Sequence, residues 1–155
     1  MDTKAAIKTL ALLAGVVVLG YLAVKISYFA KEGELKVHLR EELMQVRKAE
    51  RLLPLKPDRD LGGICRLHAK RLAEVGKNGA LKALKMPKSA TEGFEDHFVE
   101  VGYMPYGRVT MRASREFLQA ATRRSLTRAG FGQFRPRAET GTYYCYLLAG
   151  GKTAH

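Results

Sequence analysis

Cysteine is scarce in this sequence, with Cys65 and Cys145 the only two among 155 residues. Secreted scaffolds built on disulfides are rich in cysteine, whereas a domain of roughly 100 residues can be stabilised by its apolar core alone. A disulfide-built scaffold is therefore disfavoured. We expect both residues to be free thiols.

The sequence also has no complete catalytic or cofactor motif. Cys65 and His68 lie three residues apart on a predicted helix, but two ligands are too few for zinc or copper, and core positions suit both better. Gly102 and Gly107 are not followed by the Lys-Ser/Thr of a phosphate-binding loop, and they suit a hairpin turn. We expect no enzymatic activity, no cofactor and no bound metal.

Acidic residues are in the minority, with 15 Asp and Glu against 27 Lys and Arg and a net charge of +12. Such a charge implies an acidic partner, which can be nucleic acid, anionic lipid or the acidic face of another protein. Four acidic residues lie close together in a segment without Lys or Arg, and a solvated or salt-bridged surface fits them better than paired catalytic carboxylates. They are Glu92, Glu95, Asp96 and Glu100.

Arginine, by contrast, is concentrated between residues 105 and 137, where eight arginines accompany a single acidic residue, Glu116. The planar guanidinium fork suits carboxylate or phosphate and is favoured at protein interfaces. We predict that these arginines bind an acidic partner protein; a solvated basic surface and the binding of phosphate or lipid headgroups are the alternatives. They are Arg108, Arg112, Arg115, Arg123, Arg124, Arg128, Arg135 and Arg137.

A long apolar run lies near the N-terminus. Residues 5–26, at about 1.5 Å rise each, form a helix of roughly 33 Å, enough to cross a hydrocarbon core of about 30 Å. The only charged residues in this run, Lys8 and Lys25, lie near its two ends. We predict a transmembrane anchor over residues 1–30. The alternative, a cleaved secretory signal, is weakened because both candidate cleavage sites carry a tyrosine at the −3 position.

Flanking charges predict the orientation of this anchor. The N-terminal flank offers Lys4 and Lys8, whereas the C-terminal flank offers Lys25, Lys31, Lys36 and Arg40, so the domain is expected on the matrix side if the membrane is the mitochondrial inner membrane. A bacterial inner membrane with the domain in the cytoplasm is the alternative. Ala11 and Gly15 form a small-xxx-small pair that suits packing against another membrane helix, although ordinary composition explains the pair as well.

The segment from Lys31 to Leu53 repeats apolar residues at helical spacing and carries charges of nearly balanced sign. This pattern predicts an amphipathic juxtamembrane helix whose apolar stripe lies against protein. The stripe comprises Leu35, Leu39, Leu43, Val46 and Leu53. Prolines and glycines after this helix predict a linker. We assign residues 31–60 to the amphipathic helix, which we call the stalk, and to this linker. The linker residues are Pro54, Pro57, Gly62 and Gly63.

Residues 61–155 are predicted to form a small basic α+β domain with a mainly antiparallel sheet. Helices are expected over residues 64–75, 80–86 and 115–129, the last capped by Ser114 and ended by Gly130. Strands are expected over residues 97–104, 108–113 and 142–148, the first two forming a hairpin.

Tyrosines mark the last of these strands. Alternation along it places Tyr144 and Tyr146 on one face with Leu148. Aromatic residues among arginines occur in single-stranded nucleic-acid sites, but a packed sheet face fits this alternation better.

In its layout the chain resembles the single-pass supernumerary subunits of mitochondrial inner-membrane complexes. The likeness is one of architecture, namely one span, a charged juxtamembrane helix and a compact basic domain, and not of motif. It implies a non-catalytic accessory subunit that gives structural support or assembly to a respiratory-chain complex or ATP synthase. The competing prediction is a membrane tether that binds nucleic acid or ribosomes through its arginines.

Overall fold

The computed structural model describes the chain except for residues 1–2, 77–80, 82–83, 106–112 and 152–155, and it describes no side chains for residues 3–12 and 24–32. The chain divides into two compact units, Met1–Leu35 and Lys36–His155. Helix α1, Thr3–Ala49, begins in the first unit and ends in the second.

The first unit consists of the N-terminal part of α1. Among the residues that the structure describes, no helix combines the length and the apolar character needed to cross a membrane. The transmembrane helix predicted over residues 5–26 is therefore not supported by the structure. In the suggested helix-packing pair, Ala11 lies outside the described side chains, and a Cβ added at Gly15 would meet nothing within 4 Å.

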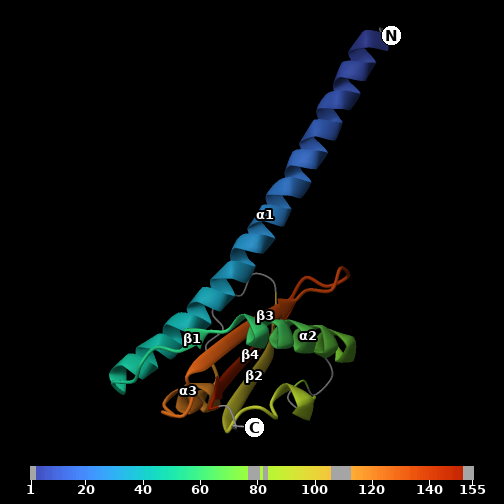
Figure 1. Ribbon diagram of the computed structural model, residues 1–155. Helices are drawn as coiled ribbons and strands as arrows, with labels where there is room; N and C mark the ends of the chain where they lie inside the picture. The colour runs from blue at the N-terminus through green and yellow to red at the C-terminus, as the bar shows by residue number, and fades with distance from the viewer. Residues whose placement is uncertain (1–2, 77–80, 82–83, 106–112, 152–155) are drawn as a thin grey trace. The chain divides into compact units, whose positions relative to one another are not determined.

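The second unit is an α+β domain built on one mixed, four-stranded sheet (Figure 1). Strand β1 pairs in parallel with β3, while β3 with β4 and β4 with β2 pair antiparallel. The prediction of an α+β fold with a mainly antiparallel sheet is thus confirmed. The elements after α1 are β1 (Lys56–Pro57), α2 (Arg59–Val75), η2 (Lys88–Ala90), β2 (Asp96–Met104), α3 (Arg115–Ala121), β3 (Arg128–Phe134) and β4 (Thr142–Gly150).

Strand β4 is the centre of this domain, and all nine of its residues are buried. One face of the sheet is covered by α2, which lies across it in Figure 1. Leu61 and Cys65 of α2 form a core there with Cys145 and Leu147 of β4. Cys65 and Cys145 are both free thiols, as expected from the sequence.

The opposite face carries the aromatic residues of the core. The rings of Phe117 in α3 and Phe131 in β3 lie 5.3 and 5.5 Å from the ring of Tyr146. Tyr144 and Tyr146 are 2% and 5% exposed, which confirms that the tyrosines of this face are packed. Leu39 and Leu43 of α1 are buried in the same unit, so the amphipathic stripe does lie against protein as predicted. Leu53, the last residue assigned to that stripe, is 83% exposed and was wrongly included.

The predicted linker at Gly62 and Gly63 is wrong, because both glycines lie inside α2. The helix begins at Arg59 and is capped by Asp58, whose carboxylate accepts hydrogen bonds from the backbone N–H groups of Asp60 and Leu61. Such a cap satisfies two of the free N–H groups of the first turn. The cap and the apolar stripe behind it outweigh the low helix propensity of the two glycines.

The helix predicted over residues 115–129 is confirmed only for its first part, Arg115–Ala121, where Ser114 caps α3 as expected by accepting a hydrogen bond from the N–H of Phe117. Helix α3 ends at Ala121, and the chain turns into β3. Gly130, expected to end the helix, pairs instead with Leu147 of β4. Pairing with the central strand here overrides the local preference for helix.

The helix predicted over residues 80–86 is wrong at its end, because Leu84, Lys85 and Met86 do not lie in a helix, while residues 80, 82 and 83 lie outside the described residues. The hairpin turn and its second strand over residues 108–113 fall almost wholly outside the described residues. The first strand of that hairpin is confirmed as β2 and pairs with β4.

Candidate partner-binding surface

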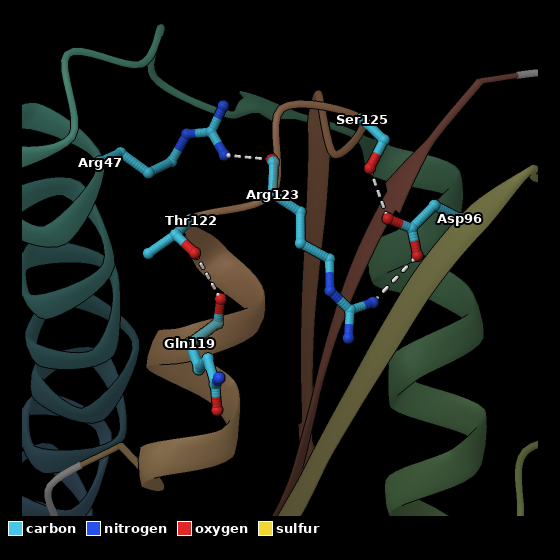
Figure 2. A network of polar contacts seen from close by, with 6 residues as sticks. All are labelled: Arg47, Asp96, Gln119, Thr122, Arg123 and Ser125. Carbon is cyan, nitrogen blue, oxygen red and sulfur yellow. Dashed lines mark hydrogen bonds and ion pairs between the residues drawn. The ribbon is translucent and has the colours of Figure 1, made fainter.

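Two of the predicted partner-binding arginines make ion pairs within the domain. Arg123 donates a hydrogen bond of 3.0 Å to Asp96, which also accepts one from the hydroxyl of Ser125 (Figure 2). The guanidinium carbon of Arg123 lies 6.0 Å from the ring centre of Phe98. The hydrogen bond from Ser125, together with the charge of Arg123, holds the pKa of Asp96 below its usual value against the opposing effect of desolvation. Arg123 therefore joins the turn after α3 to β2.

Arg128 has a similar internal role. It lies in β3, and its guanidinium is 3.4 Å from the second carboxylate oxygen of Asp58, the residue that caps α2. Arg128 therefore helps to fix α2 against the sheet. A substitution of Arg128 would therefore disturb the packing of α2 in addition to any binding of a partner.

Three of the predicted arginines remain available at the surface, namely Arg115, Arg124 and Arg137. All three are exposed, and none makes an ion pair with a residue that the structure describes. The helix predicted over residues 115–129 would place Arg124 and Arg128 one turn apart, but Arg124 lies in a turn and Arg128 in a strand. Arg135 is partly buried, while Arg108 and Arg112 lie outside the described residues.

Arg47, which sequence reasoning missed, is the most buried charged residue of the described domain at 3% exposure. Its guanidinium donates to three backbone carbonyls, those of Leu53 at 2.6 Å, Ala121 at 2.9 Å and Arg123 at 3.3 Å. Figure 2 shows this side chain reaching from α1 toward the turn after α3. Burial lowers the pKa of Arg47. Leu39, Leu43 and Arg47 are spaced four residues apart, so they lie on the same face of α1. This spacing could have predicted from the sequence that Arg47 is buried.

Two glutamates accept hydrogen bonds from the residues that directly precede α3. Glu42 of α1 accepts a 2.7 Å hydrogen bond from the N–H of Ala113, and Glu100 of β2 accepts a 2.9 Å bond from the hydroxyl of Ser114. Glu100 is only 7% exposed. In the acidic segment of the sequence, Asp96 and Glu100 thus have structural partners, in keeping with a salt-bridged rather than catalytic role.

Cys65 and His68 both lie in the core, as expected, with exposures of 0% and 2%. Within the part of the chain that the structure describes, they do not belong to any cluster of three metal-ligating side chains. Burial, with a smaller contribution from the charge of Arg71, lowers the pKa of His68 from its ordinary value of 6.5.

This lowered pKa predicts a loss of stability in acid. The imidazole binds a proton more weakly in the folded state than in the unfolded state, so its stabilising effect is complete above pH 6.5 and declines as the pH falls below that value. We expect the melting temperature of the full chain to fall between pH 7.5 and pH 5.5, and His68→Gln to reduce this fall. His97→Gln, at an exposed position on β2, is the control and should leave the fall unchanged. A fall of equal size in the wild type and His68→Gln would contradict the assignment.

Comparison with known proteins gives no family for this chain. No family model matches any part of it, and a search of curated proteins finds no similar sequence.

Proposed function

We propose that this chain is a non-catalytic accessory subunit of a multi-subunit membrane complex, of the mitochondrial inner membrane in the first instance. In this proposal residues 5–26 anchor the chain in the bilayer beside other subunits. The α+β domain binds the acidic surface of a partner protein and gives structural support or assists assembly.

The observation that carries this proposal is the surface of α1 between residues 13 and 22. Seven large apolar or aromatic side chains there are between 46% and 69% exposed. At about 100° per residue they are distributed around the whole helix and not along one stripe. A helix that is apolar on all sides is stable only when lipid or protein covers it. The side chains are Leu13, Val16, Val17, Val18, Leu19, Tyr21 and Leu22.

The arginines support the second half of the proposal. Arg123 and Arg128 are neutralised within the domain, so the basic surface offered to a partner is narrower than the sequence suggested. Arg115, Arg124 and Arg137 retain exposed guanidinium groups that suit carboxylates. Flanking charges favour the matrix side for this domain, or the cytoplasmic side if the membrane is bacterial.

The proposal is tested by reversing the available charges. The triple variant Arg115→Glu, Arg124→Glu, Arg137→Glu should leave the chain in the membrane pellet after alkaline carbonate washing but detach it from its complex on native gels. A matched control reverses three exposed cations elsewhere in the domain, namely Arg66, Lys70 and Lys85, and should stay in the complex.

Two results would count against this function. If the triple variant and its control both stay with the complex, these arginines do not bind the partner. If the wild type is recovered in the carbonate supernatant, residues 5–26 are not an anchor. A chain that retains RNA or DNA, and loses it steeply as salt rises, would favour the competing role of a nucleic-acid or ribosome tether.

A further inference from the structure

A cavity of about 440 Å³ opens within the second unit, where α1, β1, the start of α2 and β3 meet. Figure 1 labels these four elements. The floor is aromatic, formed by Phe131 and the buried Tyr146, whose ring centres lie 5.5 Å apart. The wall carries three cations, Lys36 and Arg40 of α1 and Arg59 of α2.

These three cations are all exposed, and none of them forms an ion pair with a residue that the structure describes. The one carboxylate in the cavity wall, that of Asp58, caps α2 and is paired with Arg128, and these contacts hold its pKa below the usual value despite desolvation. The cavity therefore has a surplus of about three positive charges.

Arg40 lines this cavity together with Tyr146, although the residue as a whole is exposed. Burial raises the pKa of the Tyr146 hydroxyl, and the charge of Arg40 opposes that rise. Lys36 and Arg40 are one helical turn apart, which places them on the same face of α1.

We propose that this cavity binds a phosphate group. A phosphate monoester carries a charge of about −1.5 to −2 at pH 7 and three strong acceptor oxygens, which balances three cations better than the single charge of one carboxylate. The two guanidinium groups can each bind phosphate oxygens in pairs, and the aromatic floor suits the apolar or cyclic part that carries the phosphate. The group can belong to a soluble phosphate compound or to a phospholipid headgroup. This site is separate from the arginines assigned to the partner protein.

The test uses the full chain in a neutral detergent, with inorganic phosphate as the soluble probe and phosphatidic acid in mixed micelles as the lipid probe. Ionic strength is held constant with chloride, and phosphatidylcholine serves as the uncharged reference lipid. We expect a saturable rise in melting temperature with at least one of the two probes. The double variant Arg40→Gln, Arg59→Gln should weaken that response by about tenfold or more, because it removes the two guanidinium groups that would donate charged hydrogen bonds to the phosphate.

The matched control is Arg66→Gln, Lys70→Gln, which removes the same charge from the exposed surface of α2. It should bind as the wild type does. A response to phosphate alone identifies a soluble ligand, and a response to phosphatidic acid alone identifies a lipid. The proposal is overturned if neither probe gives a saturable response, or if the control weakens binding as much as the double variant. Because no partner protein takes part, this outcome is independent of the accessory-subunit proposal.

Discussion

Replacing Arg47 by methionine is expected to lower the free energy of unfolding by about 3 kcal/mol. The guanidinium satisfies the carbonyls of Leu53, Ala121 and Arg123, and methionine leaves three acceptors without this donor. The bond to Ala121 is buried and the other two are partly buried, and each buried, unsatisfied acceptor costs roughly 1–3 kcal/mol. Removing a buried charge that has no carboxylate partner among the described residues recovers part of this cost, because desolvation of the charge opposes folding. The loss of three hydrogen bonds outweighs that gain.

The measurement is urea unfolding of the full chain, followed by the near-ultraviolet circular dichroism of tyrosine. The sequence contains no tryptophan, and Tyr143, Tyr144 and Tyr146 are all buried in β4, so this signal reports the core directly. Lys48→Met is the control, because Lys48 is the exposed neighbour of Arg47 in α1, and it should change stability by no more than about 0.5 kcal/mol. If both substitutions changed the free energy of unfolding equally, the hydrogen bonds of Arg47 would not stabilise the domain as proposed.

Alanine at Gly132 is expected to destabilise the domain by about 3 kcal/mol. A Cβ added there would lie 2.1 Å from the backbone nitrogen of Arg66 and 2.4 Å from the carbonyl carbon of Cys65. Both atoms belong to the backbone of α2, so relief requires the helix to move off β3 and not merely a side chain to rotate. Gly130 also approaches α2 closely, since a Cβ added there would overlap Leu61 and the backbone of Gly62. These two glycines allow α2 to pack directly against the sheet.

The substitution Gly63→Ala, in α2, is expected to have the opposite effect and to stabilise the domain. Gly63 is exposed within α2, and a Cβ there would meet nothing within 4 Å. Alanine should therefore stabilise the helix by about 0.5–1 kcal/mol, because it restricts the unfolded chain and raises helix propensity. Urea midpoints that fall for Gly132→Ala and rise for Gly63→Ala would establish the close packing. A destabilising Gly63→Ala substitution would show that α2 is placed differently.

The elements with strong local signals were predicted from the sequence. Strand β4 begins with Thr142 and carries three tyrosines in its first half, Ser114 is a standard N-cap, and the leucines of α1 repeat at helical spacing. Each of these features depends on residues close together in the chain. The fold class followed from their order.

The errors arose where distant residues decide the structure. Gly130 resembles the end of a helix in the sequence, and only its pairing with β4 and the close approach of α2 explain its place in a strand. Ion pairing depends in the same way on residues far apart in sequence, since Asp58 and Arg128 are 70 positions apart. The sequence therefore identified a basic region correctly as rich in arginine but did not show which of its arginines already have partners.

The most direct test of the central claim is the size of the species that contains the wild-type chain after extraction from its native membrane with a mild detergent. The accessory-subunit account predicts that the chain migrates on native gels in a large complex, and that it stays there when the extraction salt is raised severalfold. Mass spectrometry of that band should then show membrane proteins with acidic surfaces on the same side of the membrane as the domain. A chain that migrates by itself in low salt as well as in high salt would contradict the account.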